Sequence, residues 1–317
     1  MMTGKEKLEC ILNGQIPDSP PHWELVFQIE KEMFGMDLDA IPEPDRGAHQ
    51  VEVYHRLIDD FGWAAVRGGY DVAEIARIKK ALGHKALVPA YEGWGVFWMP
   101  IGANMMDFVV RLFERPKELH REARRRCENA KQFCRQAVDA GADFFVLTYD
   151  FAYNEGPFIS PAHFADIVAP YLTELVQSIH DLGKKAILHS DGCLTKILDQ
   201  IHATGIDGYQ SIDPQGHMDI RQVREQYPDW ILMGNVACNM LQDTDEARIR
   251  DSVQYCMTYG GIGKPYIFST SNCIFKGMPP ESYRIMFDEY QRLCKMSKTC
   301  PTTHSNATSC PRGHLAK

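Results

Sequence analysis

A histidine and an aspartate stand two residues apart where a short apolar run, 186–188, ends. His189 continues that run, and a histidine on a buried strand must either satisfy both ring nitrogens or bind something. In an extended chain residues two apart share a face, so His189 and Asp191 would be presented together. The pair predicts metal ligands or an acid/base site at the end of a strand. The alternative interpretation is that Asp191 only caps a following helix.

Zinc is the metal that this chemistry favours, because it accepts imidazole nitrogen, thiolate sulfur and carboxylate oxygen in a tetrahedral shell. The predicted ligands are His189, Asp191 and Cys273. Cys193 or Cys238 could replace one of them. Cys238 and Cys273 could equally be small buried apolar side chains, which is the commoner role of a cysteine such as Cys238.

Further polar side chains stand at or near the ends of other apolar runs. Asp150 ends one run and Glu155 follows a few residues later, while Glu24, Gln210 and Asn235 occupy comparable positions elsewhere. Carboxylates, histidine and cysteine that converge from distant positions are typical of a metal site or an acid/base site. Glu155 could instead pair with a neighbouring cation on a surface loop.

The elements that must position these groups alternate between apolar runs and amphipathic helices. This alternation indicates parallel strands with crossover helices. The expected strands are 23–27, 64–67, 96–99, 144–149, 185–189, 208–211, 230–236 and 266–269. Helical periodicity is clearest over 116–140, 161–182, 244–259 and 280–294. Eight strands with intervening helices predict an α/β protein, a (β/α)8 TIM barrel whose site lies at the carboxyl ends of the strands.

The barrel is expected to form a single domain over residues 1–295. Segment 71–90 fits the repeat less well and is expected to be an extended excursion or a hairpin at the barrel mouth. The tail, 296–317, carries two Cys-x3-His pairs that could form a small zinc knuckle. It is also rich in Ser, Thr and Pro and lacks an apolar core, which predicts disorder.

Composition narrows the class of protein and of partner. The chain has 317 residues, 44% of them hydrophobic, which is enough to bury a sizeable core. The 34 basic and 42 acidic residues give a net charge of -8, so we expect no nucleic-acid partner. The N-terminus lacks the apolar core of a signal peptide and no long apolar run follows, so we expect a cytoplasmic protein without a membrane partner. The ten dispersed cysteines then predict free thiols.

Eight short motifs follow one another in an order that carries a resemblance. They are Gly4–Leu8, Leu12–Gly14 before Pro17, Leu147–Asp150, Gly156–Pro161, His189–Gly192, Gly205–Gly208, Met233–Val236 and Ser269–Asn272. Over residues 3 to 295 the chain resembles the uroporphyrinogen decarboxylase superfamily. The resemblance implies a TIM barrel and one of two chemistries.

One chemistry of the superfamily removes acetate carboxyls from a porphyrinogen with eight carboxylates, which the family binds with an arginine-rich N-terminal signature. Here the first arginine is Arg46, and Glu24 stands where a cation would be wanted. A negatively charged protein with this opening suits such a polyanion poorly. The resemblance therefore favours the other branch, the corrinoid-linked methyltransferases of anaerobes.

In the zinc-dependent coenzyme M enzymes of that branch, the ligands are a His-x-Cys pair and a later cysteine. By position, His189 matches the histidine and Cys273 the later cysteine, whereas Asp191 stands where the first cysteine would be. The His-Ser-Asp-Gly form is more similar to the O-demethylase and related enzymes. This implies a small methylated donor, an ether or an amine, and a separate corrinoid protein as partner and methyl acceptor.

The implied reaction assigns roles to the remaining residues. Zinc, or a proton from Glu155 or Asp150, would activate the leaving group while the cobalt of the partner's corrinoid attacks the methyl carbon. Tyr149 and Trp94 would form an apolar wall for an aromatic donor. The substrate contacts would be completed by three polar residues, Glu24, Gln210 and Asn235.

Two alternatives stay open at this point. The chain could be a decarboxylase that acts on a porphyrinogen or a smaller carboxylated substrate, with Asp150 or Asp71 stabilising a protonated intermediate. It could also be a noncatalytic member of the family that only binds a ligand.

Overall fold

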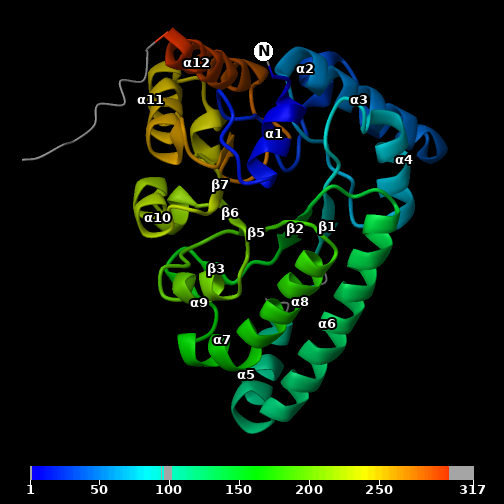
Figure 1. The fold of residues 1–317 in the computed structure, drawn as a ribbon, viewed down its shortest axis with the longest axis vertical. Coiled ribbons are helices and arrows are strands. Elements are labelled where there is room, and N and C mark those ends of the chain that lie inside the picture. Colours follow the sequence, from blue (N-terminus) through cyan, green and yellow to red (C-terminus); the bar gives the residue numbers. More distant parts are fainter. Residues whose placement is uncertain (1, 94, 96–101, 300–317) are drawn as a thin grey trace, which may run out of the picture.

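A parallel sheet of six strands forms most of a barrel wall in the computed structural model, which describes residues 2–93, 95 and 102–299. Neighbouring strands follow the order β1, β2, β5, β6, β7, β8. Figure 1 labels the first five of these strands. Their bounds are Ala90–Glu92, Phe145–Thr148, Ala186–Ser190, Gly208–Ser211, Ile231–Val236 and Tyr266–Thr270. The strands are short and buried on both faces, as expected of parallel strands covered by helices.

Two extended segments close the ring between β8 and β1. The Trp23 amide donates to the Phe268 carbonyl at 3.2 Å, and the Ala64 amide donates to the His22 carbonyl at 2.8 Å. The Val66 amide then donates to the Leu87 carbonyl at 2.9 Å, which joins the second segment to the one that ends in β1. With these two segments the wall has eight members, which confirms the (β/α)8 fold. Only single bridges join them, and for this reason they are not regular strands.

Helices cover the outside of this wall. Figure 1 shows α11 and α12 near the N-terminus, and α5 to α8 on the other side of the strands. The bounds are α1 Gly4–Leu12, α2 Glu30–Phe34, α3 Arg46–Phe61, α4 Val72–Leu82, α5 Met105–Glu114, α6 Pro116–Asp139, α7 Pro161–Ile167, α8 Ala169–Asp181, α9 Leu198–Ala203, α10 Ile220–Gln226, α11 Glu246–Cys256 and α12 Pro280–Thr299. None of the helices in the described ranges is long and apolar enough to cross a bilayer.

The prediction for the third strand needs correction. The predicted range 96–99 lies outside the described residues, and the third position of the wall is filled by the segment that ends in β1. Segment 71–90 is therefore neither an excursion nor a hairpin, since it holds α4 and leads into β1. Three buried apolar residues at helical spacing, Ile75, Ile78 and Leu82, hold α4 against the wall.

Two other predicted boundaries also differ. The helix predicted over 161–182 breaks at Val168 into α7 and α8, because Pro170 cannot donate a helical hydrogen bond. Helix α12 continues to Thr299, so the first four residues of the predicted tail, 296–299, are helical. Residues 300–317, with both Cys-x3-His pairs, lie outside the described residues.

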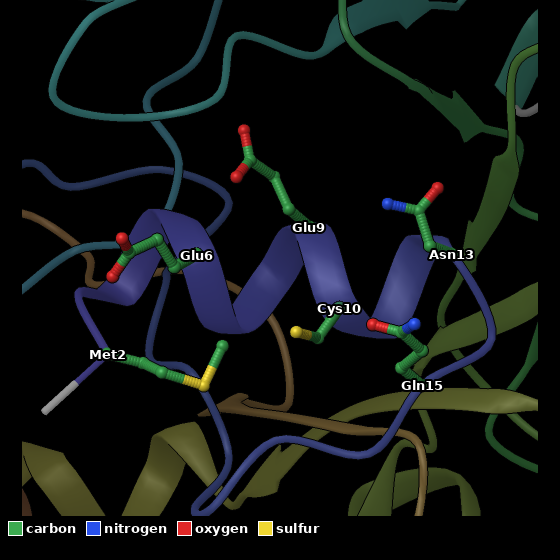
Figure 2. Close-up of a pocket in the computed structure, with 6 residues that line it drawn as sticks. All are labelled: Met2, Glu6, Glu9, Cys10, Asn13 and Gln15. Atoms are coloured by element: carbon green, nitrogen blue, oxygen red, sulfur yellow. The ribbon is translucent and has the colours of Figure 1, made fainter.

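Helix α1 covers the amino ends of the strands. Its Lys5 ammonium donates to the Gly83 carbonyl in the loop that precedes the third member of the wall, at 2.8 Å. A hollow of about 490 Å³ lies beside α1, and Figure 2 shows the residues that line it, which are Met2, Glu6, Glu9, Cys10, Asn13 and Gln15. Because the chemistry of a barrel belongs to the carboxyl ends of its strands, we exclude this hollow as the active site.

Helices α11 and α12 are tied together by a buried carboxylate. The Glu289 side chain of α12 is 1% exposed and accepts hydrogen bonds from Arg250 at 3.0 Å and Gln254 at 2.9 Å, both on α11. Hydrogen bonds from Arg292, Gln254 and Arg250 lower the pKa of Glu289 to about 2 from an ordinary 4.5. The ionised form is therefore stabilised by folding.

This lowered pKa gives a pH-dependent stability. A carboxylate whose pKa is lower in the folded chain contributes fully above about pH 4.5 and loses its contribution as the pH falls toward 2. We expect Glu289→Gln to lower the free energy of unfolding by about 1–3 kcal/mol at pH 7 and by much less at pH 3. Urea unfolding at both pH values measures this, with exposed Asp288→Asn as the control. An equal loss at both pH values would contradict the assignment.

Candidate functional site

Three side chains converge at the carboxyl ends of β2 and β5. His189 is the penultimate residue of β5, Asp191 follows that strand, and Asp150 follows β2. The His189 Nε2 atom lies 3.8 Å from Asp191 Oδ2 and 3.9 Å from Asp150 Oδ1. One potential ligand atom from each residue lies within 4.8 Å of the others. We call these three residues the mouth cluster.

The orientation of His189 is fixed by a second residue. The Gln210 side-chain amide donates to the carbonyls of Thr270 and Ser271, at 3.4 and 3.3 Å, so its oxygen is left to accept. That oxygen contacts His189 Nδ1, which must therefore carry the proton. The lone pair of Nε2 then points toward the two aspartates, as in a histidine prepared to bind a metal.

Asp191 is held from both sides. The Ser211 hydroxyl donates to its Oδ1 at 2.6 Å, and the Asn272 amide donates to its Oδ2. Burial raises the pKa of Asp191, while His189 and the Ser211 bond oppose the rise. No helix in the described part of the chain begins at this residue, and the next one, α9, starts at Leu198. The capping interpretation is therefore not supported.

The backbone of β6 is bent at Ser211. Its φ is +95°, a left-handed value that few residues other than glycine adopt. The preceding residue, Gln210, contacts His189, whereas Ser211 itself contacts Asp191. Adjacent residues of a regular strand point to opposite faces, so the bend allows both side chains to reach the mouth cluster.

Asp150, and not Cys273, lies together with His189 and Asp191. Its side chain is 58% exposed, and its Oδ1 accepts the backbone amide of Asp191 at 3.1 Å. Cys273 follows β8 and lies outside the mouth cluster. Burial raises the pKa of Cys273 to about 12, and the charges of Cys238 and Asp191 add to the rise.

The two alternative thiols are also placed away from the mouth cluster. Cys238 is buried, its Sγ lies 3.5 Å from the Cys273 carbonyl, and burial raises its pKa. This is the environment of a small apolar side chain. Cys193 is half-buried, with its Sγ 3.5 Å from the Thr195 hydroxyl.

A small hairpin borders the mouth cluster. It consists of β3, Ala152–Tyr153, and β4, Gly156–Pro157, and exposed Glu155 stands at its turn. The Cys193 amide donates to the Tyr153 carbonyl at 3.0 Å, which ties the hairpin to the loop after β5. Gly192 permits this close approach, because a Cβ atom there would lie 2.8 Å from the backbone of β3.

Two predicted residues lie behind the wall or within it. The Tyr149 hydroxyl donates to Glu92, whose charge raises the pKa of Cys134 on α6 after the larger effect of burial. Tyr149 therefore belongs to the layer between the strands and α6. Glu24 is fully buried, and its carboxylate accepts hydrogen bonds from Ser269 at 2.9 Å and from the amide and hydroxyl of Thr270.

Asn235 and Trp94 complete the predicted set. The Asn235 amide donates to the Ile212 carbonyl at 2.8 Å, and its oxygen accepts from Cys256 on α11. Asn235 lines a separate cavity of about 390 Å³ that α11 also borders, so it does not join the mouth cluster. Trp94 lies outside the described residues. Asp71, proposed for a decarboxylase, caps α4 by accepting the Glu74 amide at 3.0 Å.

The sequence interpretation missed Arg67, which ends the second predicted strand. Its guanidinium carbon lies 5.1 Å from the centre of the Tyr70 ring and 5.0 Å from that of Tyr91. Its charge opposes the rise in the pKa of Cys273. Its place at a strand end was visible in the sequence, but nothing there indicated that it has no ion pair or hydrogen bond with the described residues.

Comparison with known proteins identifies the fold's relatives. The methyltransferase from Methanosarcina mazei is similar at a TM-score of 0.73 with 15% identity, covering 92% of this chain and 99% of that one. The E. coli 3-keto-D-glucoside 4-epimerase is similar at 0.47 with 12% identity, covering 82% and 96%. An L-ribulose 3-epimerase is similar at a TM-score of 0.48 with 12% identity, covering 80% and 94%. No curated protein matches the sequence.

A family model settles the relationship that the motifs indicated. The model described as uroporphyrinogen decarboxylase (URO-D) matches residues 46–293, well over half of the chain. The chain therefore belongs to the uroporphyrinogen decarboxylase family.

Proposed function

We propose that this chain is a methyltransferase that moves a methyl group from a small methylated donor, an ether or an amine, to a corrinoid carried by a separate protein. The mouth cluster is the observation on which the proposal depends. The family relationship and the similarity to a methyltransferase support it. A cytoplasmic location, expected from the sequence, is part of the same proposal.

The mouth cluster fits a divalent cation. Three lone pairs, from Asp150, His189 and Asp191, face one another at 3.8–3.9 Å from the histidine, too far apart for hydrogen bonds and close to the spacing of metal ligands. Two carboxylates supply the charge that would balance such a cation. Imidazole and carboxylate ligands suit zinc, so we keep zinc as the proposed ion and replace Cys273 with Asp150 as the third ligand.

The protein's own groups would align the donor and manage its proton. A bound cation would act as a Lewis acid on the donor oxygen or nitrogen. Transfer to the partner's Co(I) corrinoid would break the bond from that atom to the methyl carbon as the carbon–cobalt bond forms, and the released heteroatom would need a proton. Glu155, at the exposed turn beside the mouth cluster, is the proposed proton donor.

The roles of Asp150 and Glu155 can be separated by experiment. Free cob(I)alamin can stand in for the partner's corrinoid, with methanol, methylamine and 4-methoxybenzoate as donors, and loss of the Co(I) absorbance measures transfer. We expect Asp150→Asn to lose both bound metal and activity. We expect Glu155→Gln to keep the metal and lose roughly tenfold to a hundredfold in rate. Asn154→Ala, at the same turn, is the control.

Two outcomes would contradict this proposal. Methyl transfer that is unchanged in Asp150→Asn would remove the mouth cluster from the reaction. Release of carbon dioxide from uroporphyrinogen without a corrinoid, together with no methyl transfer, would identify the chain as a decarboxylase instead.

A further inference from the structure

Arg67 differs from the other arginines of the described ranges. Its side chain is half-buried, yet it makes no ion pair and no hydrogen bond there, and its only partners are the rings of Tyr70 and Tyr91. The other described arginines without such a bond are exposed, and they are Arg121, Arg125, Arg135 and Arg284. Water can satisfy an exposed guanidinium, whereas a half-buried one without an acceptor among the described residues can use its N–H groups to bind a ligand.

The side chain of Arg67 points into the barrel. A Cβ atom on the next residue, Gly68, would meet Ile75 of α4 and Val88, so Gly68 faces outward and Arg67 faces inward. Tyr91 also faces inward, since its hydroxyl donates across the barrel to the Leu25 carbonyl at 2.9 Å. The guanidinium is thus held inside the mouth by two aromatic rings.

Arg67 and the mouth cluster lie at the same end of the barrel, where the strands have their carboxyl ends. The Tyr70 ring that packs on Arg67 leads toward the cluster, because the Tyr70 hydroxyl lies 3.2 Å from that of Thr148, whose strand neighbour is His189. The segment of Arg67 and the strand of His189 are three interstrand spacings apart. This is about 14 Å along the wall, and the distance straight across the mouth is shorter. A ring-sized molecule could contact both.

We propose that Arg67 binds a carboxylate on the methyl donor, so that the donor is a methylated aromatic carboxylic acid. A guanidinium fork matches the two oxygens of a carboxylate. One guanidinium cation is balanced by one negative charge, so a monoanion matches this site. The rings of Tyr70 and Tyr91 can pack against an aromatic spacer. That the ligand is a methyl donor rests on the proposed function. That the ligand carries a carboxylate rests on Arg67 alone.

Calorimetric binding to the full chain tests the carboxylate without any methyl transfer. The probes are 4-methoxybenzoate, its neutral analogue 4-methoxybenzamide, and 4-methoxyphenyl phosphate. We expect the benzoate to bind at least about tenfold more tightly than the benzamide. Arg67→Met should abolish that preference and Arg67→Lys should keep part of it, because lysine retains the charge but not the fork. Arg121→Met, at an exposed position, should change nothing.

The outcomes separate this inference from the proposed function. Equal binding of benzoate and benzamide, or a preference that survives in Arg67→Met, overturns the carboxylate site. Tighter binding of the phosphate overturns the choice of a monoanion. If the benzoate preference depends on Arg67 but no methyl is transferred to cob(I)alamin, the carboxylate site stands and the proposed function fails. If only the neutral donor is demethylated, the function stands and the inference fails.

Discussion

Replacing His189 with alanine should remove about one equivalent of bound divalent metal and lower methyl transfer at least about a hundredfold. His189 would supply the only nitrogen ligand among the described residues of the mouth cluster, and its Nε2 lone pair points at both carboxylates. Without it, two carboxylates at an open mouth would bind a cation weakly. Elemental analysis of the purified variant, beside the rate with cob(I)alamin, measures both effects.

A matched control makes the His189 result specific. His84 is exposed, and His84→Ala should keep both metal and rate. Any metal held by the Cys-x3-His pairs after residue 299 would be present in both variants, so the difference between them reports the mouth cluster alone. Full retention of metal in His189→Ala at an equal folded yield would refute the metal site.

Gly192→Ala should cost about 2–5 kcal/mol of stability and most of the activity. An alanine Cβ at this position would lie 2.8 Å from the backbone of Ala152 and Tyr153, and the φ of +81° is strained for any residue except glycine. The hairpin would have to move away from the loop that carries Asp191. Urea unfolding measures the loss of stability, and the methyl transfer assay measures the loss of rate.

Gly14 offers the comparison that isolates the contact. Its φ is +73°, but no atom lies within 4 Å of an added Cβ, so Gly14→Ala should cost only about 1 kcal/mol and leave the rate unchanged. Equal losses of stability in the two variants would mean that backbone strain alone explains the result. The close approach of the hairpin to Gly192 would then contribute nothing to stability.

The sequence predicted the strands that bear the site better than those that close the barrel. Each of β2, β5, β6, β7 and β8 falls within one or two residues of its expected range, since a buried parallel strand is a short apolar run between helices. The third member was misplaced. An apolar run at 96–99 looked more like a strand than the mixed run at 87–92, whose place depends on pairing with β2.

Within the site, the local sequence pattern identified His189 and Asp191, but it did not identify Asp150 as the third member of the mouth cluster. Their i, i+2 spacing on a strand is a local property, and the structure keeps them together. The choice between Cys273 and Asp150 depends on how far each loop extends beyond its strand, which no spacing encodes. Tyr149 and Asn235 illustrate the same limit, because residues at a strand end alternate between the interior and the helical layer.

The bend at Ser211 joins the supports of His189 and Asp191 into one unit. Gln210 orients the imidazole and Ser211 the carboxylate, and they are consecutive in the chain. An insertion or deletion of a single residue in β6 would therefore withdraw both supports together. Attempts to retune this site for another metal by redesigning one ligand at a time would meet this constraint, and the end of β6 would have to be rebuilt as a whole.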